Sequence, residues 1–453
     1  MVVSPDIYNT VSQGEKRKNR KMGSIIVNIV LLGQSVKPFF SNPCALLSSL
    51  SFILRYIIKH QQIYIYEYTY VRRHVRRRLC IISQIKKKEF TYVYKMSVPI
   101  INIQDFRKGT PTDRQAFANN LADVCHSVGF FSLVGHELEE LQLRVKLMLR
   151  KIFVLERSKK ETIAKQHSKH FRGWEPLGTE LTNGRVDLRE QVDTWTDCKV
   201  VAEDMDRPYL RLYGPSQYFD DKILPGYEAL TKEFMNRCGL VADELLSAMA
   251  LGLGLHENHF RQTFGDISKR MSLCKFIHYP GSETEENKWG ENQHGVNAHK
   301  DAAFLTLLLP DGPGLEIQLF DGRWVPVEVV EGAFVINLGE ALQSLTGNYF
   351  VATPHRVVTS RERYSCGFFQ GSDLEYNISN PLPLDPKFAA KVQASKFHRE
   401  AKYMARKEET ERGVGDIGSE ATGKTYGEML WNYFSRAYPE IVNKHYGGGQ
   451  ARM

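Results

Sequence analysis

Seven short apolar segments, separated by turn signals, occupy the sequence between Met271 and about Phe369. They read SLCKFIHYP, AFLTLLL, LEIQLF, RWVPVEV, GAFVINLG, YFVATPHRVV and RYSCGFF. Asp-Gly stands between two of these segments and within the PDGPG that separates another two, and an Asp-Gly flanked by apolar runs is a strong hairpin signal. Many short antiparallel strands of this kind predict a sandwich or jelly roll.

Helical patterns surround this series of strands. Thr112 is predicted to cap a helix that ends at Gly129, a long helix is expected from about Glu137 to Ala164, and Pro225 is predicted to open a third helix. The third contains GYEALTKEFMNRCGLVADELLSAMALGLGL, with an apolar stripe at helical spacing. A short strand is expected over Val98–Phe106, and helices interrupted by RGVGDIGSEATG over 386–446. The predicted fold class is α+β, with a jelly-roll core flanked by N-terminal, central and C-terminal helices.

The first 95 residues differ in charge from the rest of the chain. They hold 17 Lys or Arg and 4 Asp or Glu, a net charge of +13, whereas the remainder has a net charge of −5. Residues 96–453 therefore give no electrostatic reason to expect nucleic acid, and we expect no membrane association for them. We interpret residues 1–95 as a disordered extension or a gene-model artefact, with Met96 as the start of the folded protein. A mitochondrial presequence and a polybasic patch that binds a membrane surface are the alternatives for this segment. Unless the segment is a presequence, we expect a cytoplasmic protein.

The seven cysteines show no pattern of a disulfide framework or a zinc site. Their number is odd, their spacing is irregular and no C-x-x-C pair occurs. We therefore expect free, mostly buried thiols in a reducing compartment.

His299 and Asp301 form the first part of a candidate metal site. In an extended segment residues i and i+2 point to the same face, so the two side chains project together. His355, which lies several predicted strands later, is the best candidate for a third ligand. Two histidines and one carboxylate suit a non-haem Fe(II) centre with open coordination positions. Taken alone, the pair His299 and Asp301 is more often a solvated turn than a metal site.

Arg363 and Ser365 repeat the i, i+2 arrangement a few residues after His355. A guanidinium and a hydroxyl that face the interior together can hold a carboxylate through two hydrogen bonds. The alternative for Arg363 is an exposed charge at a strand end, next to Arg361 and Glu362.

These motifs, in this order, resemble the Fe(II)- and 2-oxoglutarate-dependent oxygenases of the isopenicillin N synthase-like group. The similarity is carried by H-x-D, W-x-P-V, N-L-G-E, H-R-V and R-x-S, and it extends over roughly residues 98–446. The resemblance implies that His299, Asp301 and His355 are iron ligands. It also implies that Arg363 and Ser365 anchor the distal carboxylate of 2-oxoglutarate, with Tyr279 helping to hold this cosubstrate.

Two positions depart from the group's pattern. Many plant members have asparagine two residues before the tyrosine that matches Tyr279, whereas this chain has Ile277. Lys300 stands between the first two ligands, where the group often has a small or polar residue. The first departure puts the details of the cosubstrate contacts in doubt.

The resemblance implies oxidation of a small organic substrate by O2, by hydroxylation or desaturation, with 2-oxoglutarate converted to succinate. It suggests a monomer acting in secondary metabolism, with ascorbate as a candidate reductant. Two alternatives stay open: an iron-dependent oxidase that does not use 2-oxoglutarate, and a non-catalytic metal-binding jelly roll.

The sequence does not identify the substrate. The segment 170–193 is similar to a wall of the substrate pocket in the group, with Arg172, Trp174 and Glu190 as candidates, although a structured surface loop is an equal alternative. Phe368, Phe369 and the FLTLLL strand are candidates for the cavity lining, although most of these side chains are more often ordinary core residues. The predicted domain boundaries are a basic extension at 1–95, an N-terminal helical region at 96–265, the catalytic core at 266–385 and a C-terminal helical region at 386–453.

Overall fold

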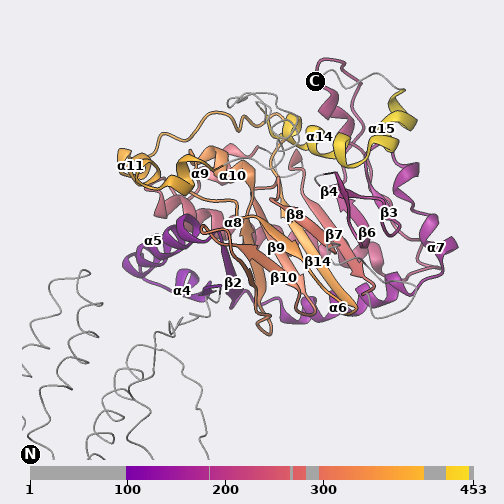
Figure 1. The fold of residues 1–453 in the computed structure, drawn as a ribbon, viewed down its shortest axis with the longest axis horizontal. Coiled ribbons are helices and arrows are strands. Elements are labelled where there is room, and N and C mark those ends of the chain that lie inside the picture. The colour runs from indigo at the N-terminus through magenta and orange to yellow at the C-terminus, as the bar shows by residue number, and fades with distance from the viewer. Residues whose placement is uncertain (1–97, 183, 266–268, 282–294, 402–424, 448–453) are drawn as a thin grey trace, which may run out of the picture. The chain divides into compact units, whose positions relative to one another are not determined.

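The computed structural model describes residues 98–182, 184–265, 269–281, 295–401 and 425–447 (Figure 1). The helices are α4 (Gln104–Arg107), α5 (Pro111–Ser127), α6 (Glu139–Phe153), α7 (Arg157–Glu161), α8 (Tyr227–Gly252), α9 (His259–Thr263), α10 (Glu340–Leu345), α11 (Pro386–Ala394), α12 (Lys396–Arg399), α14 (Tyr426–Ala437) and α15 (Pro439–Tyr446), with 3-10 turns at Lys165–His167 and Pro208–Leu212. The strands are β1 (Ile100–Asn102), β2 (Phe130–Val134), β3 (Gly173–Glu175), β4 (Leu181–Thr182), β5 (Arg185–Val186), β6 (Glu190–Trp195), β7 (Leu273–Tyr279), β8 (Val296–His299), β9 (Leu305–Pro310), β10 (Leu315–Gln318), β11 (Trp324–Pro326), β12 (Phe334–Leu338), β13 (His355–Val357) and β14 (Arg363–Gln370).

Two sheets form the centre of the fold. The larger has the strand order β1-β2-β12-β9-β14-β7-β6-β3, and the smaller has the order β11-β10-β13-β8. The ring of Phe130 in β2 lies 5.3 Å from the ring of His355 in β13, so the two sheets face each other. This arrangement confirms the predicted jelly-roll core, and the predicted hairpin is the antiparallel pair β10 and β11. One pair departs from the antiparallel pattern, because β1 and β2 run parallel.

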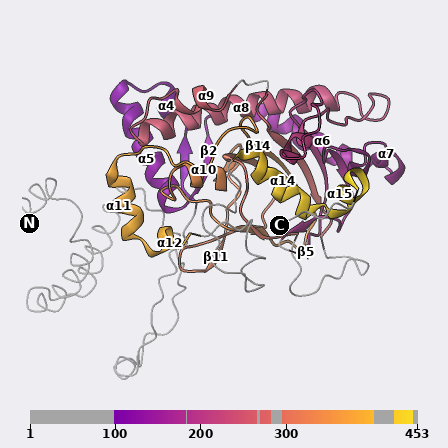
Figure 2. The ribbon, with the colours of Figure 1, turned by 90° about the horizontal axis from the view of Figure 1, so that it is seen from above.

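The long helix α8 covers the outer face of the larger sheet. Its Tyr227 ring lies 5.6 Å from Phe276 of β7, and its Phe234 ring lies 6.2 Å from Phe334 of β12. Figure 2 shows α8 along one side of the sheets and α11 with α12 on the other. The apolar stripe predicted for this helix is therefore the surface that it buries against the strands.

Several helix boundaries differ from the sequence prediction. Thr110, not Thr112, caps α5, because Pro111 occupies the first helical position and the side chains of Thr110 and Asp113 form a capping box. The long helix expected from Glu137 to Ala164 is two helices, α6 and α7, with a break after Phe153. The strand expected over Val98–Phe106 is confined to β1, because α4 begins at Gln104.

The cysteines of the described residues are free, as predicted. Cys125, Cys238, Cys274 and Cys366 are buried and Cys198 is half-buried. Burial raises the pKa of the Cys125 and Cys238 thiols, so these thiols stay protonated and unreactive at neutral pH. Cys44 and Cys80 lie outside the described residues.

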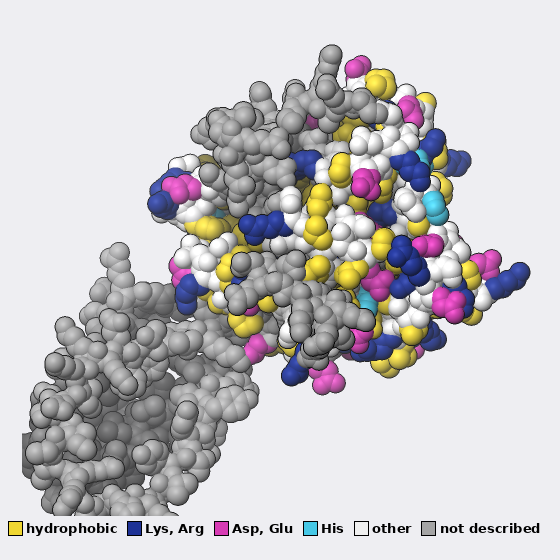
Figure 3. All heavy atoms as spheres, turned by 45° about the vertical axis from the view of Figure 1, so that its right-hand side comes forward, with side chains coloured by type: hydrophobic (Ala, Val, Ile, Leu, Met, Phe, Trp, Pro, Cys, Tyr) yellow, Lys and Arg dark blue, Asp and Glu magenta, His cyan; other side chains and the backbone are white. Residues whose placement is uncertain are grey.

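The surface and the helices of the described residues bear on the predicted partners. Basic and acidic side chains are interspersed on the face shown in Figure 3, in line with the mixed charge of residues 96–453. Of the helices within the described residues, none is long and apolar enough to cross a membrane. The basic segment 1–95, the polar loop after Gly281 and the Gly-rich loop before Thr425 fall outside the described residues.

Removal of residues 1–95 should leave the folded protein unchanged. The residues from Val93 to Met453 form one compact unit, so a protein that starts at Met96 keeps every contact described here. We expect the same melting temperature and the same rate of succinate formation as for the full chain. A large loss of either would place part of the basic segment against the fold.

Candidate metal centre

The strand register brings His299, Asp301 and His355 together. His299 ends β8 and His355 begins β13, and these two residues are direct partners across the antiparallel pair. Their rings are 4.3 Å apart, and Asp301 follows β8 by two residues on the same side. The donor atoms of the three side chains lie within 4.8 Å of one another. The three residues that the sequence separates by up to 56 positions therefore form one cluster.

Backbone carbonyls orient the two imidazoles. Nδ1 of His299 donates to the carbonyl of Asn297 (2.8 Å), and Nδ1 of His355 donates to the carbonyl of Thr353 (3.1 Å). Because Nδ1 carries the proton in both rings, Nε2 has the free lone pair. Each Nε2 lies 3.5 Å from Oδ1 of Asp301. Two nitrogen donors and one oxygen donor thus converge on one point.

The second oxygen of Asp301 is held by the larger sheet. Nδ2 of Asn337 donates to Oδ2 at 2.7 Å, and the hydroxyl of Thr306 also donates to it. Hydrogen bonds from these two donors favour the charged form of the buried carboxyl group. Asp301 is therefore an ionised carboxylate with Oδ2 fixed and Oδ1 directed at the histidines, which is the donor set that suits Fe(II).

Arg363 and Ser365 lie on one face of β14, as predicted. Nη1 of Arg363 donates to the hydroxyl of Ser365 (3.2 Å), and Nε donates to the carbonyl of Gly312 (3.3 Å). Tyr279 is the strand partner of Arg363, and the guanidinium carbon lies 5.0 Å from the centre of its ring. Arg363 is 2% exposed, and its Nη2 is buried without a hydrogen-bond partner among the described residues. A buried guanidinium with an unused donor is suited to binding a carboxylate.

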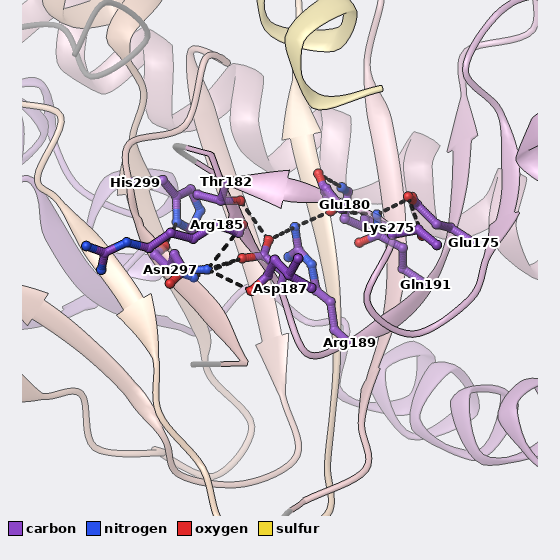
Figure 4. A network of polar contacts seen from close by, with 12 residues as sticks. Glu175, Glu180, Thr182, Arg185, Asp187, Arg189, Gln191, Lys275, Asn297 and His299 are labelled. Atoms are coloured by element: carbon purple, nitrogen blue, oxygen red, sulfur yellow. Dashed lines mark hydrogen bonds and ion pairs between the residues drawn. The ribbon is translucent and has the colours of Figure 1, made fainter. Parts of the chain in front are cut away.

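A network of buried charged and polar side chains adjoins the metal centre (Figure 4). Oδ1 of Asp187 accepts hydrogen bonds from the backbone nitrogen (3.1 Å) and Nδ2 (2.9 Å) of Asn297, whose carbonyl in turn orients His299. Asp187 and Glu180 both contact Nη2 of Arg189. The segment between β4 and β6 is thereby tied to the strand that carries the first histidine.

Lys165 pairs with two further carboxylates of this network. Nζ of Lys165 lies 2.7 Å from a carboxylate oxygen of Glu175 and 2.7 Å from one of Asp193. Burial alone lowers the pKa of Lys165, but the neighbouring carboxylates, led by Asp193, raise it to about 12. Lys165 is therefore a fixed positive charge, and it neutralises acidic groups that the sheet has removed from water.

Most of the residues that line the cavity beside the metal centre are ones that the sequence did not single out. About 60 Å³ of the cavity is open to the centre of a water-sized sphere, and His299 and Asp301 are among its lining residues. Phe369 lines it as predicted, whereas Phe368 lines a separate pocket against α8. Its other lining residues are Arg189, Trp195, Leu273, Lys275, Lys300, Ala302, Ala303, Tyr426, Leu430, Tyr433 and Phe434. Arg363, Ser365 and Tyr279 are not among the lining residues of this cavity.

Arg172, Trp174 and Glu190, the candidates for the wall of the substrate pocket, lie outside the lining of this cavity. Arg172 is fully buried and donates to the carbonyl of Thr196, and Nε1 of Trp174 donates to Glu190. Glu190 is also bound by Lys160 and His278. None of the three lines the cavity beside the metal centre in the part of the chain that the structure describes.

Two protein families match most of the described chain. The family described as non-haem dioxygenase in morphine synthesis, N-terminal, matches residues 98–221, and the 2OG-Fe(II) oxygenase superfamily matches residues 270–372. The 2-oxoglutarate-dependent dioxygenase frbJ of a Dothideomycetidae species is 30% identical over 282 residues, which are 61% of this chain and 74% of that protein. This chain is an Fe(II)- and 2-oxoglutarate-dependent dioxygenase.

Other relatives of the dioxygenase point to the same family. The homoarginine-6-hydroxylase 2-ODD-C23 of Glycine max is 29% identical over 303 residues, covering 64% of this chain and 88% of that protein. The solved structure of a 2OG-Fe(II) oxygenase family protein from Caulobacter crescentus has a TM-score of 0.52 at 23% identity, covering 67% of this chain and 99% of that one, and so shares its fold. The dioxygenase therefore uses Fe(II) and 2-oxoglutarate. The two alternatives, an iron-dependent oxidase that does not use 2-oxoglutarate and a non-catalytic metal-binding jelly roll, are not favoured.

A glycine next to Asp301 should not tolerate a side chain. Gly339 is the N-cap residue of α10, and a Cβ there would lie 1.8 Å from the carbonyl oxygen of Ala303 and 3.0 Å from that of Asp301. Because both neighbours are backbone, Gly339→Ala is expected to lower the free energy of unfolding by about 1–3 kcal/mol, measured by urea denaturation. Gly312→Ala is the matched control, because a Cβ at Gly312 meets nothing within 4 Å. Equal stability of the two variants would contradict this packing.

Proposed function

We propose that this dioxygenase oxidises a small organic molecule at an iron held by His299, Asp301 and His355. The observation that carries the proposal is the convergence of two Nε2 atoms on Oδ1 of Asp301, each at 3.5 Å. These three side chains would hold the iron through two nitrogen donors and one oxygen donor, a set that suits Fe(II) and would leave positions open for the cosubstrate and O2. Their outer hydrogen bonds, from Asn337 and to Asn297 and Thr353, keep these donors in place before metal binds.

The cosubstrate is proposed to bind with its distal carboxylate at Arg363 and Ser365. Nη2 of Arg363 has no partner among the described residues, and the Ser365 hydroxyl lies 3.2 Å from Nη1 of the same guanidinium. A carboxylate between them would accept hydrogen bonds from both side chains. The Tyr279 ring beside the guanidinium limits the directions from which the carboxylate can approach.

The chain's own contribution to the reaction is position and the exclusion of water. When bound, iron and 2-oxoglutarate supply the oxidising chemistry, in which O2 is reduced and 2-oxoglutarate is decarboxylated to succinate. Asp301 supplies one negative charge at the centre, and the two neutral imidazoles supply none. Apolar side chains of β9 and β12 are buried around Thr306 and Asn337, so Asp301 is isolated from bulk solvent on that side. The products of this proposal are a hydroxylated or desaturated substrate, succinate and carbon dioxide.

The proposal is tested most directly without oxygen. Protein loaded with Fe(II) should develop a visible metal-to-ligand absorption band when 2-oxoglutarate is added, because the cosubstrate chelates the iron. Succinate formation in air, measured against protein without iron, gives the second readout. No band at millimolar 2-oxoglutarate would refute the proposed placement of the cosubstrate on the iron.

A further inference from the structure

The cavity beside the metal centre has two chemically different walls. One wall is apolar and mostly aromatic, and it is formed by strand ends and by α14, with Trp195, Phe369, Tyr426, Leu430 and Phe434. The other wall carries basic side chains, including Arg189 and Lys275. Figure 4 shows both of these within the polar network that adjoins His299. A ligand in this cavity therefore meets both apolar and basic side chains.

The acidic partners of Arg189 do not line the cavity. Glu180 and Asp187 contact Nη2 of Arg189, and both are buried, with exposed fractions of 3% and 0%. Neither acid is among the described residues that line the cavity, whereas Arg189 is. Arg189 therefore presents its charge to the cavity, whereas its two carboxylate partners do not line it. The carboxylate that does line the cavity is Asp301, one of the proposed iron ligands.

Lys275 has longer ion pairs than Lys165 and Arg189, the other cations of this network. Its Nζ lies 3.5 Å from Glu180 and 3.6 Å from Asp193, the closest carboxylates among the described residues. Each of these acids has a closer partner, because Glu180 is hydrogen-bonded to Arg189, and Asp193 lies 2.7 Å from Lys165. Lys275 is only 5% exposed, so its ammonium has lost most of its water, and its side-chain hydrogen bond to Oε1 of Glu180 is long, at 3.5 Å. A buried charge in this state gains strongly from an anionic ligand.

Lys275 also lies well away from the proposed cosubstrate anchor. Tyr279 pairs with Arg363 and Lys275 pairs with Gly367, so Lys275 is four residues further along the same face of β7. At about 3.3 Å per residue this places it roughly 13 Å along the strand from Tyr279. Lys275 lies near the end of β7 that holds Leu273, whose strand partner is Phe369. Both of these residues line the cavity beside the metal centre.

We infer that the substrate is an organic anion: a carboxylate on an apolar ring or chain, with the carboxylate at Lys275 and Arg189 and the apolar body against α14. This inference rests on the proposed function, because it fills the cavity next to the proposed iron ligands. The carboxylate would give Lys275 the short ion pair that the fold does not provide. The apolar body would then lie between α14 and the metal centre, where its carbon atoms face Asp301 and His299.

Two matched series of probes test the inference. We suggest 3-phenylpropanoate, 3-phenylpropanamide and 3-phenylpropylamine, together with hexanoate, hexanamide and hexylamine. Each is added without oxygen to protein loaded with Fe(II) and 2-oxoglutarate, and the shift of the visible absorption band reports occupation of the cavity. In at least one series we expect the carboxylate to act at a concentration about 10-fold below that of the amide, and the amine to be the weakest. This expectation follows from the strength of a charge-assisted hydrogen bond.

The variant Lys275→Met should remove the preference for the carboxylate and leave the band with 2-oxoglutarate in place. The fold is expected to persist in this variant. Glu180 would still be paired with Arg189, and Asp193 would still be paired with Lys165. Lys275→Gln, which retains a hydrogen-bond donor without the charge, is the second variant if Met prevents folding. Lys160→Met is the matched control, because Lys160 is also a buried lysine paired with a carboxylate, Glu190, but does not line the cavity.

The outcomes separate this inference from the proposed function. A missing band in the wild-type protein refutes the proposed function itself. A normal band, with no carboxylate acting below the concentration of its amide and amine in either series, refutes only the anionic substrate. If Lys275→Met instead weakens 2-oxoglutarate binding, Lys275 belongs to the cosubstrate site and the inference is wrong. Loss of the carboxylate preference in Lys275→Met, with the preference retained in Lys160→Met, supports it.

Discussion

Alanine at His299, Asp301 or His355 should abolish stoichiometric binding of Fe(II). Each residue supplies one of the three donors that the described part of the chain brings together, and these donors lie within 4.8 Å of one another. Loss of a hydrogen bond behind a metal ligand typically costs about 10–100-fold in affinity, so loss of a ligand itself is expected to cost more than about 100-fold. Iron content after desalting, and the dissociation constant from anaerobic titration, measure the effect.

The three variants should differ in their effect on the fold. Asp301→Ala leaves Thr306 and Asn337 without their shared acceptor, whereas His299→Ala removes a side chain that is partly exposed. Melting temperatures therefore have to be measured beside iron content. His256→Ala, which changes an exposed histidine outside the cluster, is the control for nonspecific loss. Iron content equal to that of the wild-type protein in all three variants would show that the ligands lie elsewhere.

The core of the fold was predictable because its strands are short, apolar and separated by Asp-Gly turns. Seven of the eight strands from β7 to β14 have their counterpart in a segment of the sequence, since alternation and turn chemistry are local properties. The exception is β8, because its four residues VNAH are too few and too polar to stand out as an apolar segment. Boundaries set by packing were not predictable in the same way. The break between α6 and α7 interrupts an amphipathic pattern that continues through it, and Pro111 moves the start of α5 by two residues.

The residues of the candidate site also differ in how far local sequence patterns could reveal them. His299 with Asp301, and Arg363 with Ser365, are i, i+2 pairs, so the shared face of each pair follows from strand geometry alone. Lys275 and Arg189 were missed because nothing local marks them. Lys275 becomes notable only when β7 places it against α14, which begins some 150 residues later in the chain. Its long ion pairs depend on the positions of Glu180 and Asp193, which the sequence does not reveal.

Arg172 illustrates the opposite error. Its position in a segment similar to a pocket wall made it a candidate, but the side chain points into the protein, where Nη2 donates to the carbonyl of Thr196. Burial lowers the pKa of this guanidinium to about 10. A motif alignment can locate a loop, but the direction of each side chain depends on packing that only the structure provides.

Arg363→Ala should weaken 2-oxoglutarate binding about 10–150-fold and leave Fe(II) binding intact. Arg363 is 2% exposed, two of its nitrogens are engaged by Gly312 and Ser365, and Nη2 is left for the cosubstrate. A charge-assisted hydrogen bond of this type contributes about 1.5–3 kcal/mol, and each 1.4 kcal/mol is a tenfold change in affinity. The visible band of the anaerobic Fe(II) complex, titrated with 2-oxoglutarate, gives the dissociation constant directly.

Arg363→Lys should recover only part of this affinity, because an ammonium cannot donate to Ser365 and a carboxylate with the planar geometry of a guanidinium. Arg356→Ala is the matched control, since Arg356 also lies on a strand and pairs with a carboxylate, Glu316, but is partly exposed and lies outside the site. Unchanged 2-oxoglutarate affinity in Arg363→Ala would mean that the distal carboxylate binds elsewhere. Loss of iron in the same variant would mean instead that Arg363 supports the metal centre, and the separation between anchor and ligands drawn from β14 and β13 would then be wrong.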